Sequence, residues 1–450
     1  MSTISELLAG WIQELQFHDI PIQLVQAAKD DILDMFGCGL FGSKCSWVST
    51  VADLIKDWGG KKEASIWGHK KKVPCVNAVF TNANAVNAFE FDDSYVPTGI
   101  HPGALVVTSV LASAEKLGTV TGQDMITAVV VGHEISARVR SGLGWSVLHG
   151  WNGTAICSTF GAAAATAKVL DLNVDGIVNA LGICGPYVGG LLTYGYKAMA
   201  KRIVNARSAQ GGLLAAFLAE LGFTGFRDIF ESEQGGFCRT HSSDPTIDLI
   251  TKDLGSEYLM RNLVLKKYPN CTSFHAVADA ISGILSKQSI NSSRIESVVI
   301  NTTSGALKNN VGKMYDNISS AQMSMEYAAA VFLVDGELGV DQYSVKRIES
   351  PDIREMIQKV RIVIDPYLDG MGLDHRMAAK VDLYLKDGSK VESNYIKRPR
   401  DMSSLELDKK FMSLSTKAIS QGQAEELKDI VKSLEKCNNV TILANLLESS

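Results

Sequence analysis

The sequence predicts a mainly α-helical protein that carries a smaller α+β domain toward its C-terminal side. Three observations support this prediction. Apolar residues recur at helical spacing through most of the first 220 residues. β-branched residues alternate in three short segments between residues 294 and 385, and helical spacing returns after residue 400. With 450 residues and 46% hydrophobic content, the chain is long enough for two domains with a substantial core.

The first 73 residues are expected to form three helices and a hairpin. Apolar side chains recur at helical spacing from Leu7 to Leu15 and from Leu24 to Phe36. Residues 47–58 predict a third helix that ends at Gly59-Gly60, because glycine favours the end of a helix. Residues 64–73 then predict a short hairpin with a basic tip.

Residues 75–222 are rich in alanine and glycine and predict closely packed helices. Small residues let helices approach one another, which is a packing feature with no chemistry of its own. The expected helices cover residues 75–90, 104–117, 122–142, 154–170, 175–185 and 205–221.

The character of the chain changes near Lys266. The segments with alternating β-branched residues predict strands, and the helices between them complete a smaller α+β domain. Strands are expected over residues 294–302, 360–365 and 379–385, with helices over 270–286, 320–334 and 350–359. After Arg400 the chain returns to helices, expected over 404–418 and 422–435.

The composition and the motifs argue against several classes of protein. A net charge of −5 and a pI near 6.0 give no reason to expect a nucleic-acid partner. No apolar run is long and continuous enough to span a membrane, and the N-terminus resembles an amphipathic helix rather than a signal peptide. The eight cysteines show no CxxC or zinc spacing, so we expect free thiols in a cytoplasmic protein. The P-loop, HExxH and GxSxG motifs are absent.

The segment Ala88–Gly103 stands out as a candidate site. It places the acid pair Asp92 and Asp93 and the imidazole of His101 in one loop between two apolar segments. Burying such groups is costly without a partner or a ligand, so this density of polar groups predicts a site. Pro102 suits the first position of a helix, whose free N–H groups can receive a carboxylate.

Other polar groups stand alone in apolar surroundings, and each has an ordinary structural interpretation. A lone histidine is more often a capping or core residue than a catalytic one, and Lys201 and Arg202 can lie on a solvated turn. Tyr327 is by default a half-buried aromatic residue, and Cys271 has no paired base that would make it a nucleophile. These groups lie in the segments His149–Asn152, Tyr194–Arg202, Lys266–His275 and Met325–Tyr327.

Seven segments occur along the chain as candidate family motifs. The segments are Gly59–Gly68, Glu90–Gly103, Ser158–Ala165, Lys201–Ala216, Leu221–Gly225, Lys267–His275 and Leu333–Gly336. Their order and spacing resemble those of the MmgE/PrpD family over nearly the whole chain. That family includes 2-methylcitrate dehydratase, cis-aconitate decarboxylase and iminodisuccinate epimerase.

The resemblance implies an architecture and a set of partners. It implies a large all-helical domain formed by both chain ends, residues 1–265 and 399–450, with an inserted α+β lid domain over residues 266–398. A cleft between the domains would bind a small carboxylic acid. The resemblance also implies a homodimer and neither a metal nor an organic cofactor.

The resemblance further implies roles for particular residues. Imidazoles and a lysine can transfer protons at a carbon next to a carboxylate and stabilise an enolate-like charge. Asp93 would orient His101 or fix its tautomer, and Lys201 with Arg202 would offset the charges of the substrate. The catalytic residues would be Asp93, His101, Lys201, His275 and Tyr327, and the substrate-binding residues Thr98, His149, Asn152, Arg202 and Lys267.

Two departures from the family pattern leave the reaction open. Asn152 and Val204 stand where dehydratases and decarboxylases of the family usually have histidines. Neither can shuttle a proton, so one acid/base group is missing unless His149 replaces it. The leading hypothesis is a lyase, a dehydratase or decarboxylase, acting on a substrate such as 2-methylcitrate, another alkylcitrate or cis-aconitate. The alternatives are an epimerase of an iminodisuccinate-like acid and a catalytically degenerate dimeric binding or scaffold protein.

Overall fold

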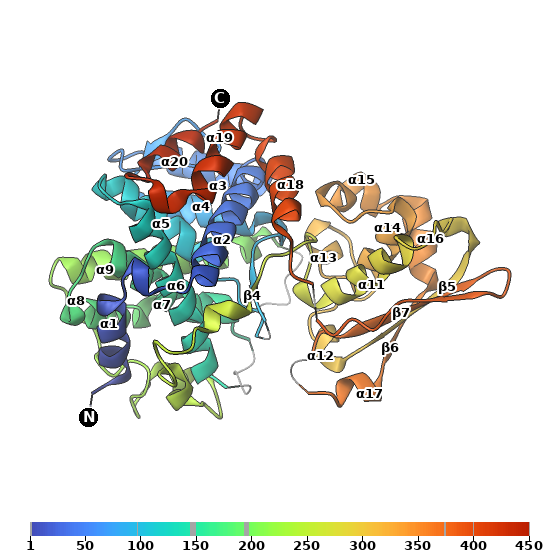
Figure 1. Ribbon diagram of the computed structural model, residues 1–450, viewed down its shortest axis with the longest axis horizontal. Helices are drawn as coiled ribbons and strands as arrows, with labels where there is room; N and C mark the ends of the chain where they lie inside the picture. The colour runs from blue at the N-terminus through green and yellow to red at the C-terminus, as the bar shows by residue number, and fades with distance from the viewer. Residues whose placement is uncertain are drawn as a thin grey trace.

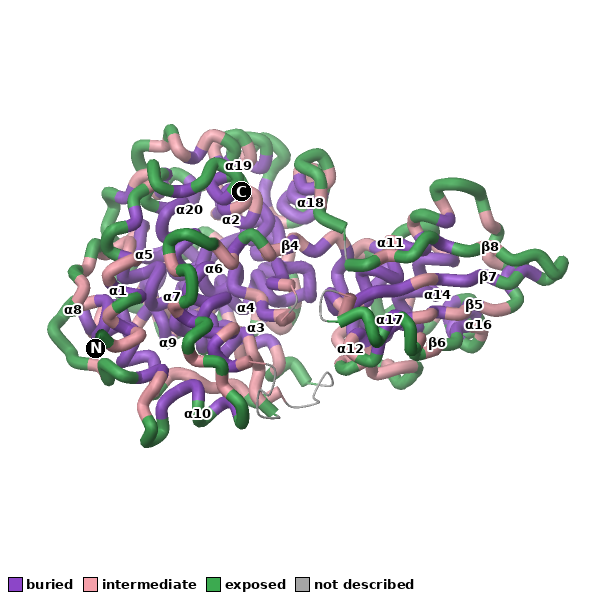
Figure 2. Tube along the Cα trace, turned by 60° about the horizontal axis from the view of Figure 1, so that its bottom comes forward, coloured by how far each residue is buried: buried purple, intermediate pink, exposed green. Residues whose placement is uncertain are grey.

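The chain folds into two lobes, each with its own hydrophobic core (Figures 1 and 2). The structure is a computed structural model that describes residues 2–96, 98–144, 150–192, 198–372, 375–398 and 400–449. The buried core of the larger lobe draws on residues between 8 and 260 and between 407 and 447, so both ends of the chain contribute. The core of the smaller lobe consists of Phe89 and residues between 268 and 385. The expectation of a mainly α fold is confirmed.

Helices form most of the larger lobe, as the alanine- and glycine-rich sequence predicts. Close approach between them depends on glycine: a Cβ at Gly161 of α7 would lie 2.4 Å from the carbonyl oxygen of Gly132 in α6. A Cβ at Gly212 of α9 would lie 2.5 Å from the carbonyl oxygen of Thr159 in α7. The helices up to residue 241 are α1 (Ile4–Glu14), α2 (Ile22–Gly42), α3 (Ser46–Trp58), α4 (Cys75–Val86), α5 (Gly103–Leu117), α6 (Gly122–Gly142), α7 (Gly153–Val169), α8 (Val174–Ile183), α9 (Ile203–Glu220) and α10 (Phe237–His241).

The C-terminal helices return to the larger lobe. They are α18 (Ser404–Ser415), α19 (Gln421–Lys432) and α20 (Thr441–Leu446). Helices α18 and α19 contact α2, and α20 contacts α5, so the C-terminal segment packs on helices from the first 117 residues. The two termini themselves lie on opposite sides of the larger lobe (Figure 1). The expected hairpin is present as β1 (Ala64–Ser65) paired with β2 (Lys72–Val73). Among the described helices, none is both long and apolar enough to cross a bilayer.

The smaller lobe contains a four-stranded sheet in the order β6-β5-β7-β8. β5 (Ile295–Thr302) runs parallel to β6 (Val360–Ile364) and antiparallel to β7 (Ala379–Leu385), and β7 pairs with β8 (Lys390–Glu392). Alternate side chains of β5 are buried, because α11, α14 and α16 pack on the sheet. The helices of this lobe are α11 (His275–Leu285), α12 (Ser304–Leu307), α13 (Ile318–Ala321), α14 (Met325–Asp335), α15 (Val345–Ile348), α16 (Pro351–Lys359) and α17 (Pro366–Asp369).

Two contacts fix the loop after α4 between the lobes. β3 (Ser94–Tyr95) pairs antiparallel with β4 (Leu263–Val264), just before the chain enters the smaller lobe. From the smaller lobe, the Gln322 side chain donates hydrogen bonds to the carbonyl oxygens of Phe89 at 2.6 Å and Pro269 at 3.0 Å. The loop after α4, which carries Asp92 and Asp93, is therefore held by both lobes.

Candidate active site

A cavity with a volume of about 410 Å³ lies where the two lobes meet. Four of the residues predicted from the sequence line this cavity: Thr98, His101, Asn152 and Lys201. The larger lobe also contributes Asn87, Glu90, Arg140, Trp151 and Asn205, and the smaller lobe contributes Cys271–Ser273, Lys308, Asn309, Met323, Arg376 and Met377. Both lobes are therefore needed to form the site.

The position and the tautomer of His101 are set by backbone contacts. Its Nδ1 lies 2.5 Å from the carbonyl oxygen of Asp93, and its backbone N–H donates to Thr154 Oγ1 at 3.0 Å. A carbonyl only accepts, so Nδ1 carries the proton and Nε2 has a free lone pair. Burial, reinforced by the charge of Lys266, lowers the pKa of His101 below its ordinary 6.5. At neutral pH, His101 is thus a neutral imidazole with a basic Nε2 beside the cavity.

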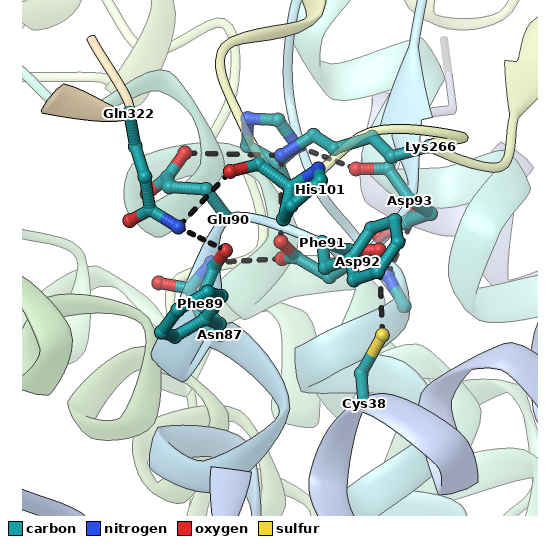
Figure 3. Close-up of polar contacts among 12 residues, drawn as sticks. Cys38, Asn87, Phe89, Glu90, Phe91, Asp92, Asp93, His101, Lys266 and Gln322 are labelled. Atoms are coloured by element: carbon teal, nitrogen blue, oxygen red, sulfur yellow. Dashed lines mark hydrogen bonds and ion pairs between the residues drawn. The ribbon is translucent and has the colours of Figure 1, made fainter. Parts of the chain in front are cut away.

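Glu90 is the centre of an ionic cluster near His101, and Figure 3 shows its contact with one member of that cluster, Lys266. Its carboxylate contacts Lys201 and lies 2.8 Å from Arg202 and 3.8 Å from Lys266. Burial alone would raise its pKa, but the charges of these three side chains together hold the pKa well below the ordinary value. Glu90 also has a left-handed backbone with φ of 56°, a conformation that is costly for a residue with a side chain. The cations offset this cost and keep the carboxylate ionised.

Lys201 and Arg202 are neighbours in the chain but serve different surroundings. Lys201 lines the cavity, and its burial lowers its pKa, while the carboxylate of Glu90 opposes that shift. Arg202 does not line the cavity: its guanidinium bonds Glu90, the carbonyl oxygen of Asn87 and, in the smaller lobe, Ser319 and Gln322 at 3.0 Å each. Arg202 therefore links the two lobes, and Lys201 is the cation of this pair that a ligand can reach.

Asp92 has a fully buried partner of opposite charge. Lys266, with no exposed surface, lies 3.5 Å from the Asp92 carboxylate, which also accepts a hydrogen bond from Asn87 at 2.8 Å (Figure 3). Burial works against a charged lysine, yet the carboxylates of Asp92 and Glu90 raise the pKa of Lys266. Asp92 thus supports the loop without lining the cavity.

Asp93 lies behind His101 and does not line the cavity. Its Oδ2 accepts a hydrogen bond from the backbone N–H of Gly103, the first residue of α5, at 3.1 Å. The helix N-terminus that was expected to receive a carboxylate therefore receives one from its own loop. Burial, and then the negative charges of Asp31 and Asp92, raise the pKa of Asp93 well above its ordinary value. The contact of Asp93 with His101 comes from its backbone carbonyl and not from its carboxyl.

Among the described residues, one group of three has ligand atoms close enough to hold a metal ion. The group is Asp31, Asp93 and His133, whose candidate ligand atoms all lie within 4.8 Å of one another. His133 Nε2 lies 2.8 Å from Asp31 Oδ2, and the three side chains are buried. The hydrogen bonds therefore join His133 to Asp31, while Asp93 lies beside this pair and bonds Gly103.

A second set of cations lines the cavity and was not predicted from the sequence. Arg140 comes from α6, while Lys308 and Arg376 come from the smaller lobe. The available signal for Arg140 was the presence of two arginines in an apolar helix. Arg138 bonds Glu134 and four backbone carbonyls, so it is a structural residue, whereas Arg140 reaches the cavity. Glu90 was also missed as a site residue, although it stands two positions before the acid pair.

Asn152 and Thr98 present polar atoms to the cavity. Asn152 is the N-cap of α7, and its side-chain oxygen accepts from the backbone N–H of Ala155 at 3.0 Å. Its NH2 group has no partner among the described residues, so it can donate to a ligand. Thr98 Oγ1 is buried and likewise has no described partner. Val204, the other departure from the family pattern, packs beside Gly190 and does not line the cavity.

The remaining predicted residues lie away from the cavity or outside the described residues. His275 is buried beside Tyr268, and burial, with the charges of Lys266 and Lys410, lowers its pKa to about 3. Tyr327 is buried in the core of the smaller lobe, where its hydroxyl donates to the carbonyl of Gln342. Lys267 lies 3.3 Å from Glu406 of α18. His149 falls outside the residues that the structure describes.

The fold and the cavity together define a two-lobed, mainly α protein with a cationic site between its lobes. Two family models match its sequence: the MmgE/PrpD N-terminal domain over residues 6–250 and the MmgE/PrpD C-terminal domain over residues 268–436. The chain belongs to the MmgE/PrpD family.

Three similar proteins carry names that refer to the same reaction. A cis-aconitate decarboxylase-like protein, oryM, of Aspergillus oryzae is 27% identical over 98% of this chain and 96% of its own length. The cis-aconitate decarboxylase of Aspergillus terreus is 26% identical over 99% of this chain and 96% of its own length. The cis-aconitate decarboxylase of Mus musculus is 25% identical over 100% of this chain and 94% of its own length.

Proposed function

We propose that this chain is a cofactor-independent lyase that acts on a small tricarboxylic or dicarboxylic acid, with decarboxylation of a cis-aconitate-like acid as the leading reaction. The observation that carries this proposal is the combination of a neutral imidazole, His101, and four cationic side chains in one cavity. The names of the similar proteins support the same substrate class.

The proposed reaction needs an electron sink and a proton donor. When the carbon–carboxylate bond breaks, its electron pair moves through the neighbouring double bond onto a retained carboxylate, and carbon dioxide leaves. A carbon of that system must then receive a proton. Lys201 fits the donor role because burial lowers the pKa of its ammonium group, which makes it a better acid. The other cations of the cavity would stabilise the charge that develops on the retained carboxylates.

Dehydration uses the same groups in a different order. His101 Nε2 would remove a proton from the carbon next to a carboxylate, and Lys201 would protonate the leaving hydroxyl.

Epimerisation of a small dicarboxylate is the second candidate. This reaction needs two proton-transfer groups, and His101 and Lys201 are such a pair. Asn152 is not a third, because an amide does not transfer protons and its side-chain oxygen caps α7. The cavity thus favours a proton-transfer reaction next to a carboxylate. Whether that reaction is decarboxylation, dehydration or epimerisation depends on the substrate.

A single incubation experiment separates these reactions. The protein would be mixed with cis-aconitate, 2-methylcitrate or an iminodicarboxylate in deuterated water, and carbon dioxide, alkene absorbance and deuterium uptake would be followed. Carbon dioxide release or alkene change supports a lyase, and deuterium exchange without either supports an epimerase. If none of the three acids gives carbon dioxide, an alkene change or deuterium uptake, and His101→Ala behaves in the same way, both the lyase and the epimerase hypotheses are contradicted. Activity that EDTA abolishes and a divalent metal restores would overturn the cofactor-independent mechanism.

We also propose that residues 266–398 act as a lid domain and that the protein is a homodimer. The separate core of the smaller lobe supports the first of these proposals. Limited proteolysis with and without substrate would test the lid, since closure would protect the connections near residues 266 and 398.

Light scattering would test the proposed homodimer by giving the oligomeric state. The eight cysteines are free in the structure, which fits the reducing, cytoplasmic compartment that we propose.

A further inference from the structure

The cavity contains a cationic group that is separate from the ion pairs of Glu90. This group consists of Arg140, Lys308 and Arg376. Glu90 contacts Lys201, Arg202 and Lys266, and no described carboxylate forms an ion pair with Arg140 or Lys308. The group is therefore distinct from the ionic cluster near His101, although both border the same cavity.

Arg140 is held in place by the larger lobe. The residue is only 7% exposed, and its guanidinium donates to the carbonyl oxygen of Gly144 at 2.8 Å. This bond uses one of five N–H groups, so the guanidinium can still bind a carboxylate in a bidentate manner. A buried charge with so few partners is costly, and the cost falls when an anion binds.

The two cations of the smaller lobe lie close to each other. Lys308 follows α12, and the side chain of Arg376 crosses the same helix at Gly305. A Cβ at Gly305 would lie 2.4 Å from Arg376 Cγ and 3.1 Å from Arg376 Nε, so only glycine leaves room for this path. Burial, and then the charges of Arg376 and Arg140, lower the pKa of Lys308. The three cations thus repel one another across the boundary between the lobes.

The charge of the cavity matches a particular ligand class. The described residues that line it include four cationic side chains, those of Arg140, Lys201, Lys308 and Arg376, and one carboxylate, that of Glu90. With His101 neutral, cations outnumber carboxylates by three among these described side chains. A fully ionised tricarboxylate carries three negative charges, and a dicarboxylate carries one fewer. The cavity is therefore electrostatically complementary to a tricarboxylate.

We propose that Arg140, Lys308 and Arg376 form a carboxylate-binding subsite built by both lobes, which binds the carboxylates that the reaction leaves intact and selects tricarboxylates over dicarboxylates. This proposal rests on the proposed function for the identity of the ligand. Because one cation comes from the larger lobe and two come from the smaller lobe, a bound carboxylate would also draw the lobes together.

The test measures binding without turnover. Tricarballylate has three carboxylates but no double bond or hydroxyl group, and glutarate has only two carboxylates. Calorimetry would give the Kd of each for the wild-type protein, for Lys308→Gln and for Arg376→Gln. Each variant should raise the Kd for tricarballylate by about tenfold or more, because a hydrogen bond to a charged group is lost, and should narrow its preference over glutarate. Lys313→Gln, at an exposed lysine outside the cavity, is the matched control and should leave both values unchanged.

Gly305→Ala provides a second variant that removes no charge. The added methyl would displace the Arg376 side chain, so tricarballylate should again bind more weakly while thermal unfolding reports that the fold is intact. A wild-type Kd for tricarballylate in Lys308→Gln, Arg376→Gln and Gly305→Ala alike would overturn the subsite, even if the enzyme turns over a tricarboxylate. Charge-dependent binding of tricarballylate without turnover of any acid would instead support the subsite and contradict the proposed function.

Discussion

Asp93 and Asp31 each direct one carboxyl oxygen, Oδ1, toward the space in front of Gly103. A Cβ at Gly103 would lie 3.0 Å from Asp93 Oδ1 and 3.1 Å from Asp31 Oδ1, and neither oxygen has a hydrogen-bond partner among the described residues. One carboxyl oxygen of Asp31 lies within 4.8 Å of one of Asp93, and two negative charges that close together are costly in a buried site. The charge of Asp31 therefore adds to burial in raising the pKa of Asp93. His101 bonds the same residue, but through the backbone carbonyl oxygen of Asp93.

The first prediction concerns stability and pH. The folded protein binds the Asp93 proton more tightly than the unfolded chain does, because the pKa of Asp93 is raised in the fold. The contribution of Asp93 to the free energy of unfolding is fully present below the ordinary Asp pKa. It is lost as pH rises through the raised pKa of Asp93 in the folded protein. In Asp93→Asn an amide, which cannot ionise, replaces the carboxyl. Urea unfolding between pH 5 and pH 9 should therefore show a smaller loss of stability with rising pH than in the wild type.

The control for this experiment is Asp53→Asn, at a surface position, which should keep the wild-type slope. Asp93→Ala should lower the free energy of unfolding by about 1–3 kcal/mol at every pH, because it leaves the buried N–H of Gly103 without its partner. Equal pH slopes in the wild type and in Asp93→Asn would mean that Asp93 is ionised in the fold.

The second prediction concerns the pH dependence of activity. In dehydration and epimerisation His101 acts as the base, and it can do so only when neutral. Its pKa lies below 6.5, so activity in these reactions is lost as pH falls through that lowered value. The acid limb of kcat/KM against pH should thus lie below pH 6.5. His101→Ala should reduce kcat by about 10²–10⁴-fold, and the residual activity should lack this limb. An acid limb that persists unchanged in His101→Ala would assign the titration to another group.

The elements of the fold could be predicted because they depend on local patterns. Helical spacing gave α6 as residues 122–142, as observed, and alternating β-branched residues gave β7 as 379–385. The hairpin at residues 64–73 is present as well. These elements follow from the spacing of apolar and β-branched residues, and that information lies within ten to twenty residues of the chain.

The candidate site could be predicted only in part, because it depends on contacts between distant segments. The density of polar groups in one loop indicated His101, but nothing local distinguishes Arg138 from Arg140. The difference arises because carbonyls between residues 250 and 257, more than a hundred positions later, surround Arg138. Glu90 was missed for the same reason, since its importance comes from Lys201 and from residues beyond it in the chain.

The third prediction tests Glu90 as the centre of its ionic cluster. Glu90→Gln removes the carboxylate shared by Lys201, Arg202 and Lys266 and leaves buried positive charges unpaired. The free energy of unfolding at pH 7 should fall by about 3–5 kcal/mol. The pKa of Glu90 is depressed in the fold, so its contribution is present above the ordinary value of 4.5 and is lost as pH falls below it. The gap between variant and wild type should therefore narrow in acid.

The matched control is Glu233→Gln, which breaks the exposed pair with Arg239 and should change stability by less than about 1 kcal/mol. A similar, small effect of both substitutions in chemical denaturation would show that the cations near Glu90 are stabilised in some other way.

The fourth prediction separates the two roles of Asn152, which caps α7 and lines the cavity. Asn152→Asp keeps an N-cap oxygen, so stability should remain near that of the wild type, but the new carboxylate faces an anionic substrate and should raise KM. Asn152→Ala should lower the free energy of unfolding by about 0.5–2 kcal/mol through loss of the cap. Asn173→Asp, at the N-cap of α8 outside the cavity, should change neither stability nor KM. An unchanged KM in Asn152→Asp would place the substrate away from this end of α7.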